Sequence, residues 1–185
     1  MTEQGDGSGI RIRGVHKRFD DLVVLEGADL DVPRGQARVI LGRSGQGKSV
    51  LLKLIVGLLK ADAGSITVDG TEVTELSRRQ LYGLRQRFSM VFQAGALFDS
   101  MTVNQNIGLG LKEHTKLPES EINRRAEAAL EMVDLAGAGD KLPAELSGGM
   151  RKRASLARAI VTEPDYLLYD EPTTGLDPIT SDHIN

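Results

Sequence analysis

Residues 42–49 constrain the fold most strongly, because they read Gly-Arg-Ser-Gly-Gln-Gly-Lys-Ser and match the pattern G-x-x-x-x-G-K-S. The glycines remove the Cβ atoms that would stop successive backbone N–H groups from turning inward around one anion. Lys48 adds a mobile positive charge suited to β- and γ-phosphates, and Ser49 adds a hydroxyl ligand for Mg²⁺. A chance match in a chain of this length has odds on the order of one in a hundred. The pattern therefore predicts a nucleoside-triphosphate site between a strand and a helix.

Residues on both sides of this loop predict that strand and that helix. The apolar run Ala37–Leu41 follows the turn signal Pro33-Arg34-Gly35 and is expected to form a buried strand. Ser49–Leu59 has no helix breaker before Gly57 and predicts a helix packed on a sheet. Earlier in the chain, β-type runs predict strands at Ile10–Phe19, Leu22–Leu25 and Ala28–Val32.

After this helix, the sequence predicts a hairpin and then a return to the sheet. Ser65–Val68 and Glu72–Val73 flank Asp69-Gly70, which is a strong two-residue turn signal. A polar helix is expected from Ser77, as its N-cap, to Arg87. A core strand is then expected at Phe88–Phe92.

Between residues 94 and 146 the apolar period becomes helical, which predicts a helical subdomain inserted into an α/β core. One apolar helix face is formed by Ile122, Ala126, Ala129, Leu130 and Val133. A further helix is expected over Arg151–Val161, and Tyr166–Tyr169 is expected to be a buried parallel strand.

Two other segments carry residues suited to a triphosphate. Asp170-Glu171 ends the last predicted strand and resembles a Walker B pair, in which Asp170 would hold Mg²⁺ and Glu171 would polarise the attacking water. Taken alone, two adjacent acids are more often a solvated strand end. Ser147-Gly148-Gly149 precedes a helix and could grip a γ-phosphate, or could be a helix cap without a ligand.

The composition excludes several other classes of function. The chain has no cysteine, so disulfides, thiolate zinc sites and cysteine nucleophiles are excluded. A net charge of -3 gives no global field for nucleic acid, and the basic clusters, which are Arg78, Arg79, Arg85, Arg87 and Arg151-Lys152-Arg153, are expected to be solvated or internally paired. The polar residues 1–9 are expected to be a flexible tail without a signal peptide, and the protein is expected to be cytoplasmic.

The order of phosphate loop, Gln93, Leu146-Ser147-Gly148-Gly149-Met150, acidic pair and Gly175-Leu176-Asp177-Pro178 resembles the ABC ATPase domain. The resemblance implies a P-loop NTPase core with an N-terminal antiparallel β-subdomain and an inserted α-helical subdomain. The implied bounds are a tail at 1–9, the core and β-subdomain at 10–93 and 151–185, and the helical subdomain with the signature at 94–150. The core would be truncated at its C-terminus, since a switch histidine normally follows one more strand and His183 comes too early.

The resemblance also implies roles for individual residues, with ATP and Mg²⁺ as the cofactors. Catalysis would use Glu171, Lys48 and Gln93, and Mg²⁺ would be held by Ser49, Gln93 and Asp170. Phe19 would stack on adenine, and Asp177 would lie at a dimer contact. The remaining nucleotide contacts would come from Gly42, Arg43, Ser44, Gly45, Gln46, Gly47, Lys48, Ser49 and Val50, with Ser147, Gly148 and Gly149 acting from a second copy.

In that family two ATPase domains pair head to tail, and the resemblance therefore implies a homodimer bound to membrane permease subunits. Met150, where the signature commonly has Gln, and the segment Phe92–Phe98 look like the ATPase of Mla or Mce-type lipid transporters. This implies a site on the inner face of a bacterial membrane, coupling helices docked near Ala94–Met101, and an MCE-type lipid-binding partner. Because the switch region is absent, the chain alone is expected to hydrolyse ATP weakly. A non-transport ABC ATPase and a non-catalytic regulatory subunit remain alternatives.

Overall fold

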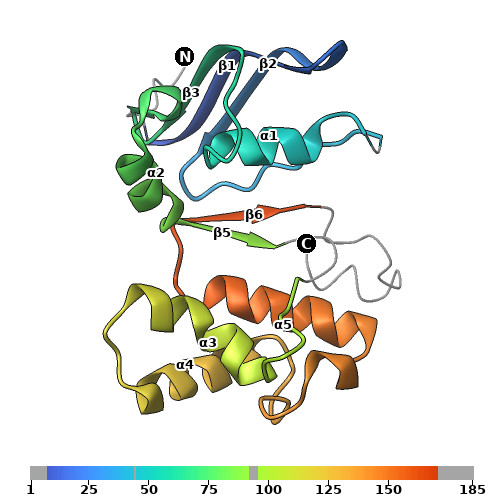
Figure 1. Cartoon of the computed structure of the whole chain (residues 1–185), viewed down its shortest axis with the longest axis vertical. Helices are drawn as coiled ribbons and strands as arrows, with labels where there is room; N and C mark the ends of the chain where they lie inside the picture. Colours follow the sequence, from blue (N-terminus) through green and yellow to red (C-terminus); the bar gives the residue numbers. More distant parts are fainter. Residues whose placement is uncertain (1–7, 44, 92–95, 171–185) are drawn as a thin grey trace. The chain divides into compact units, whose positions relative to one another are not determined.

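The computed structural model describes residues 8–43, 45–91 and 96–170, and Figure 1 shows its elements along the chain. The chain divides into two compact units, residues 1–86 and residues 87–185. Among the described residues, no helix is both long and apolar enough to cross a membrane.

The first unit contains a four-stranded antiparallel sheet in the order β2-β1-β3-β4. Its strands are β1 (Gly9–Phe19), β2 (Leu22–Pro33), β3 (Ala63–Val68) and β4 (Thr71–Glu72). Along β1 the side chains of Ile10, Ile12 and Val15 are buried while Arg11 and Arg13 are exposed, as expected when one face of a sheet covers a core. The predicted antiparallel β-subdomain is therefore present.

The two runs predicted at Leu22–Leu25 and Ala28–Val32 form the single strand β2. The pairing of β1 with β2 shifts register on either side of Val15, where Gly14 and Gly27 have φ of 54° and 69°. Left-handed glycines of this kind allow a β-bulge, which bends a strand without ending it. The glycine at position 27 therefore marks a bend in β2 and not a break.

The prediction of a strand at Ala37–Leu41 is wrong for this structure. Within the described ranges, residues 37–41 belong to neither sheet, and Val39 and Leu41 are 81% and 88% exposed. A strand is defined by hydrogen bonds to a neighbouring strand. The apolar composition of a segment does not show whether another strand pairs with it.

The hairpin predicted around Asp69-Gly70 is confirmed. Asp69 and Gly70 have φ of 45° and 76°, and Val68 pairs with Thr71 across the turn. Two successive positive φ values define the turn that best fits strand twist. A short 3₁₀ helix, η1 (Val73–Glu75), follows β4, so Val73, predicted to be in the second strand, lies outside β4.

Helix α1 (Lys48–Ile55) follows the glycine loop and buries Leu51, Leu52, Leu54 and Ile55. It ends before the predicted Leu59, because Gly57 adopts a φ of 64°. There the Leu58 N–H donates to the Lys53 carbonyl at 2.9 Å and the Gly57 N–H donates to the Leu54 carbonyl at 3.0 Å. This is the pattern of a Schellman motif, which closes a helix at a left-handed glycine.

Helix α2 (Arg78–Arg85) begins at Ser77 as predicted, through a capping box with Gln80. Its last residue, Arg85, donates from Nε to the Val56 carbonyl at 3.0 Å and from Nη2 to the Gly57 carbonyl at 2.7 Å. The guanidinium therefore satisfies carbonyls that the end of α1 leaves without intrahelical partners.

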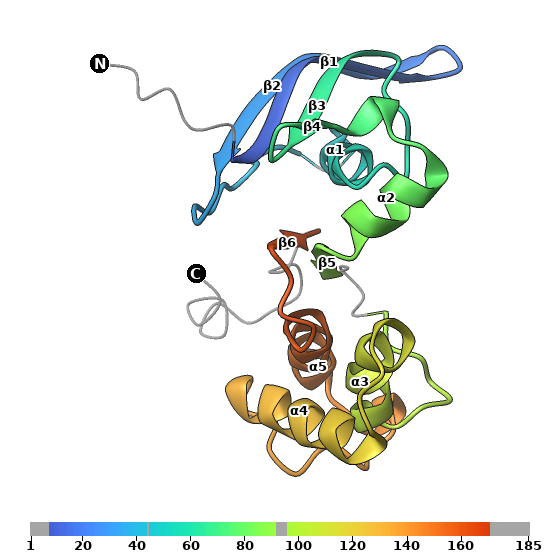
Figure 2. The same ribbon diagram turned by 90° about the vertical axis from the view of Figure 1, so that its left-hand side faces the viewer.

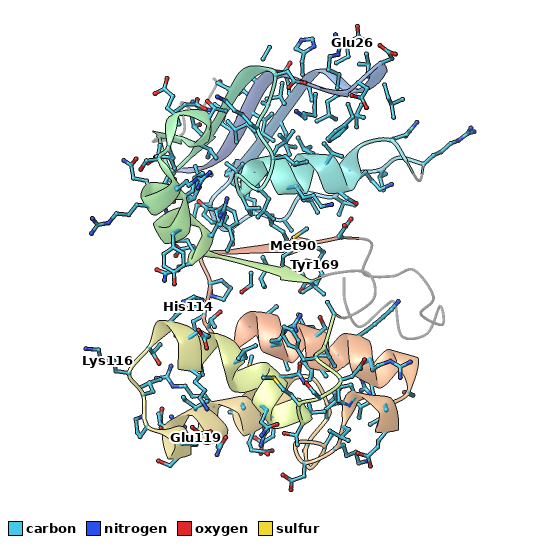
Figure 3. The ribbon with its side chains drawn as sticks, in the orientation of Figure 1. Glu26, Met90, His114, Lys116, Glu119 and Tyr169 are labelled. Carbon is cyan, nitrogen blue, oxygen red and sulfur yellow. The ribbon has the colours of Figure 1, made fainter. Side chains whose placement is uncertain are left out.

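The second unit contains two parallel strands, β5 (Phe88–Val91) and β6 (Tyr166–Tyr169), which lie side by side in Figures 1 and 3. The rings of Phe88 and Tyr166 stack with centroids 4.9 Å apart, and Arg87 pairs with Asp165 at 2.7 Å. Both strands agree with the predicted ranges, except that Phe92 lies outside the described residues.

Three helices in this unit enclose one apolar core, and Figure 2 shows them grouped together. They are α3 (Val103–His114), α4 (Glu119–Met132) and α5 (Gly148–Ile160), with a 3₁₀ turn, η2 (Pro143–Glu145), before α5. The apolar face predicted for α4 is buried in full, from Ile122 to Val133. The predicted helical subdomain is therefore present, with Ala154, Ala157 and Val161 of α5 in its core.

Asn106 on α3 is fully buried and joins this helix to the turn that precedes it. Its Oδ1 accepts from the Phe98 N–H at 2.7 Å, and its Nδ2 lies 3.0–3.1 Å from the carbonyls of Phe98, Met101 and Thr102. One amide thus contacts four backbone groups and satisfies the Phe98 N–H and up to two of the three carbonyls, while the Phe98 side chain stays 53% exposed.

Candidate functional site

The phosphate loop connects residues 37–41 to α1, and two of its glycines have the left-handed backbone that the motif predicts. Gly45 and Gly47 both have a φ of 82°. A Cβ on Gly47 would meet Val24 Cγ1 at 2.8 Å, so this position also needs a glycine because the loop passes close to β2. Ser44 is the one loop residue outside the described ranges.

Lys48, the first residue of α1, folds back over the loop. Its Nζ donates to the Gly42 carbonyl at 2.7 Å and to the Arg43 carbonyl at 3.0 Å. Ser49 and Val50 follow it in the first turn of α1. The structure therefore brings together the loop backbone, the ammonium group and the positive end of a helix, as the sequence predicts.

Gln46 makes a contact that the sequence analysis missed. Its Oε1 accepts a hydrogen bond from the Arg43 N–H at 2.8 Å, and the Gln46 N–H lies 3.3 Å from the Arg43 carbonyl. The motif leaves this position open to any residue, so only the folded loop can show where the amide goes.

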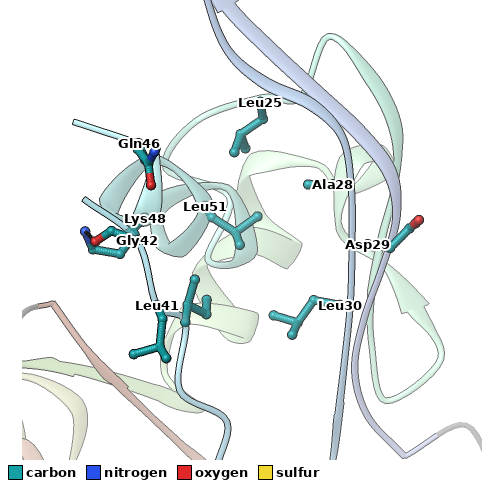
Figure 4. Close-up of a pocket in the computed structure, with 11 residues that line it drawn as sticks. Leu25, Ala28, Asp29, Leu30, Leu41, Gly42, Gln46, Lys48 and Leu51 are labelled. Atoms are coloured by element: carbon teal, nitrogen blue, oxygen red, sulfur yellow. Dashed lines mark hydrogen bonds between the residues drawn. The ribbon is translucent and has the colours of Figure 1, made fainter. Parts of the chain in front are cut away.

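A hollow of about 240 Å³ lies next to the loop, as Figure 4 shows. Its lining is chiefly apolar and comes from β2, from the segment before the loop and from α1, with Leu25, Leu30, Ile40, Leu41 and Leu51 as its larger side chains. Gln46 and Lys48 lie at its polar end. The apolar part does not suit a triphosphate, so phosphate contacts are expected at the loop and not in this part of the hollow.

Phe19, the residue expected to stack on adenine, ends β1 and is 41% exposed. The Lys17 ammonium lies 5.2 Å from its ring centroid, within the range of a cation–π contact. Asp62 pairs with Lys17 at 2.9 Å and also accepts from the Arg18 N–H at 2.7 Å. These bonds, first the one from Lys17, hold the pKa of Asp62 below its usual value. Sequence reasoning missed Lys17 and Asp62, which are 45 positions apart.

In the second unit, Asp170 directly follows β6. Its N–H donates to the Val91 carbonyl at 3.0 Å, which extends the ladder between β5 and β6 by one bond. Asp170 is therefore fixed at the carboxyl end of a parallel pair, where open α/β sheets place ligands. Burial raises the pKa of its neighbour Tyr169, so that phenol stays neutral. Glu171, the predicted base, lies outside the described residues, as do Gln93 and Asp177.

Ser147 is the N-cap of α5, and its Oγ accepts from the Met150 N–H at 3.2 Å. Gly148 and Gly149 form the first turn, and a Cβ on either would meet no atom within 4 Å. The segment therefore forms a helix cap, and its contact with a γ-phosphate stays a prediction. It is also compatible with a ligand, since a hydroxyl that accepts one bond can still donate its proton to a phosphate oxygen.

Four arginines of the basic clusters have partners within their own unit. Arg85 and Arg87 make the contacts given above, Arg151 donates to the Leu146 carbonyl at 2.8 Å, and Arg153 lies 3.4 Å from the Asp134 carbonyl. These contacts agree with the prediction of internal pairing.

The family model described as ABC transporter matches residues 25–174, and the chain therefore belongs to that family. The phosphate loop, the signature helix and the acidic strand end all lie within the match.

Two groups of curated proteins are similar over almost the whole chain. A probable ribonucleotide transport ATP-binding protein mkl of Mycobacterium leprae is 46% identical over 97% of this chain and 52% of its own length. The intermembrane phospholipid transport system ATP-binding protein MlaF of Escherichia coli is 44% identical over 96% of this chain and 66% of its own length. The chain thus spans about half to two thirds of these relatives.

Solved structures of cassettes are similar as well. The dimeric cassette MJ0796, in a post-hydrolysis state bound to ADP and Pi, superposes with a TM-score of 0.85 at 29% identity and covers 95% of this chain and 79% of its own. CbiO1 from Clostridium perfringens, part of the transporter complex cbiONQ, gives a TM-score of 0.85 at 34% identity, covering 96% and 70%. The α/β cassette fold predicted from the sequence is confirmed.

Proposed function

We propose that this chain is the ATP-binding and ATP-hydrolysing part of an ABC transporter, driving transport through a nucleotide-dependent dimer. The observation that carries the proposal is the phosphate loop, in which left-handed Gly45 and Gly47 and the folded-back Lys48 gather donors at the start of α1. Donors gathered in this way suit the oxygens of a di- or triphosphate.

The residues that would hold Mg²⁺ with the nucleotide are Ser49 and Asp170, together with Gln93. Hydroxyl and carboxylate oxygens are the ligands that this hard cation prefers, so the side-chain chemistry of Ser49 and Asp170 suits it. Bound there, Mg²⁺ would neutralise charge on the β- and γ-phosphates. Lys48 would bind the same phosphates, and Glu171 would take a proton from the attacking water.

The signature segment would act on the nucleotide of a second copy. Ser147 keeps its proton available while its oxygen caps α5, and Gly148 and Gly149 leave the approach to the helix open. A γ-phosphate bridging this helix start and the loop of a partner would favour the closed dimer, and hydrolysis would release it. The similarity to MJ0796, described as a dimer bound to ADP and Pi, supports a nucleotide-bound dimer.

The transported substrate is proposed to be a phospholipid or a related hydrophobic molecule. Support comes from MlaF, named for phospholipid transport, although the equally similar mkl proteins are named for ribonucleotide transport. We further propose that permease subunits hold the protein on the inner face of the membrane, near Ala94–Met101, with an MCE-type subunit as a further partner. Purifying the assembled complex and identifying its membrane subunits and bound lipid would decide between the two substrates.

Nucleotide binding is tested by calorimetry with Mg-ATP on the intact protein and on Lys48→Ala. We expect Lys48→Ala to lower the affinity by roughly a hundredfold or more, because phosphate charge loses its ammonium partner. Lys53→Ala, on the exposed side of the same helix, is the matched control and should bind normally. Equal affinity for all three proteins would overturn the phosphate-loop assignment.

Hydrolysis is tested separately with Glu171→Gln. We expect ATP turnover to be lost while ATP binding and ATP-dependent dimerisation persist, because a glutamine amide cannot accept the proton. Unchanged turnover would remove Glu171 from the mechanism and leave the binding function standing.

A further inference from the structure

Among the described residues, the side chains of Lys48 and Gln46 both bond the backbone of the phosphate loop, in different ways. Lys48 donates to the carbonyls of Gly42 and Arg43, at 2.7 and 3.0 Å. Gln46 instead accepts from the Arg43 N–H, at 2.8 Å. Figure 4 shows Gln46, Lys48 and Gly42 together at one end of the hollow.

The Gln46 contact closes a ring across the start of the loop. Arg43 receives a hydrogen bond at its carbonyl from the Gln46 N–H, at 3.3 Å, and donates its own N–H to the Gln46 side chain. Arg43 and Gln46 are therefore joined by two bonds that are internal to the loop. A bond of this kind removes conformations that a ligand would otherwise have to order.

We infer that Gln46 is a positioning residue whose side-chain amide holds the phosphate loop in its binding conformation before the nucleotide arrives. This inference rests on the proposed nucleotide-binding function. It gives the side chain a part that the motif does not assign, because the motif uses this position only for its backbone.

The missing Cβ of Gly42 also supports this assignment. A Cβ built on Gly42 would lie 2.8 Å from Gln46 Oε1, closer than such atoms approach in proteins. The Gly42 backbone itself is not in the left-handed region, so its φ does not demand a glycine. The first glycine of the loop therefore leaves room for the Gln46 amide as it crosses to Arg43.

The competing role for Gln46 is direct contact with the γ-phosphate. The two roles differ in their dependence on the nucleotide. A side chain that holds the loop backbone in shape, here called the Gln46 brace, affects the binding of ADP and ATP alike. A side chain that contacts the γ-phosphate affects the binding of ATP alone. They differ also in the free protein, where only a brace protects the Arg43 amide from exchange.

The test uses Gln46→Met, which keeps the length of the side chain and removes the acceptor. We expect its affinities for Mg-ADP and Mg-ATP, measured by calorimetry on the intact protein, to fall equally, by roughly threefold to tenfold. KM for ATP should rise by the same factor with kcat unchanged, since the lost interaction acts before the chemical step. Arg43 amide exchange, followed by NMR without nucleotide, should become faster.

Gln36→Met, at an exposed position outside the loop, is the matched control and should change none of these values. Gly42→Ala should lower nucleotide affinity by a smaller factor in the Gln46→Met background than in the wild type, because both changes remove the same contact. Unchanged affinity, a loss confined to ATP, or an unaltered Arg43 amide would each overturn the brace. A wild-type protein that binds no nucleotide would instead overturn the proposed function.

Discussion

Replacing Asn106 with alanine tests how the helical unit holds the turn before α3. The amide is fully buried and accepts one hydrogen bond while its nitrogen approaches three carbonyls. Alanine removes all of these bonds and leaves the Phe98 N–H without its acceptor. The unpaired Phe98 N–H and the loss of two or three hydrogen bonds, at about 1 kcal/mol each, should lower the free energy of unfolding by about 3 kcal/mol.

Urea unfolding followed by circular dichroism measures this change. With an m value of about 2 kcal/mol/M, the unfolding midpoint of the helical unit should fall by roughly 1.5 M. Asn123→Ala makes the same substitution at an exposed position on α4 and should stay within about 0.5 kcal/mol of the wild type. Coincident midpoints for the two variants would show that the Asn106 bonds do not hold the turn.

The remaining predictions concern two glycines, one carboxylate and one ammonium. Gly57→Ala should destabilise the fold by more than about 1 kcal/mol, because the φ of Gly57 is 64°. Gly83→Ala in α2, where a Cβ has open space, should instead stabilise the fold by up to about 1 kcal/mol. Thermal unfolding of the two variants and the wild type measures both changes. Hydrogen bonds from two arginines lower the pKa of Glu121 to about 2, so its stabilising contribution is complete above the ordinary value of 4.5 and disappears as the pH falls toward 2. The melting-temperature difference between wild type and Glu121→Gln should therefore shrink over that interval, and a constant difference would contradict the assignment. Lys17→Met should weaken ATP binding by roughly threefold in calorimetry, through loss of the cation beside the Phe19 ring; unchanged affinity would show that Lys17 does not support Phe19.

Features encoded by neighbouring residues were predictable from the sequence. The Asp69-Gly70 turn, the Ser77 cap and the buried face of α4 each depend on residues a few positions apart. Their patterns have one low-energy local solution, which the fold then uses. The phosphate loop belongs to the same class, because its glycines and lysine lie within eight positions.

Features that depend on distant partners were not predictable in this way. The run Ala37–Leu41 has the composition of a strand, yet no neighbour pairs with it in the part of the chain that the structure describes. Lys17 beside Phe19 depends on Asp62, which comes from a distant part of the chain. The Gln46 brace is local, but a position that the motif leaves free carries no signal of it.

The parallel pair β5 and β6 sets a condition on the order of folding. Arg87 and Asp165, which meet beside this pair, are 78 positions apart, and the helical core occupies most of the chain between them. Closing so long a loop as a random coil is entropically slow, whereas a folded insert brings its two ends near each other. The helices should therefore fold first, and β5 and β6 should pair afterwards. A chain emerging from the ribosome would place Asp170 at the strand end only when this late step is complete.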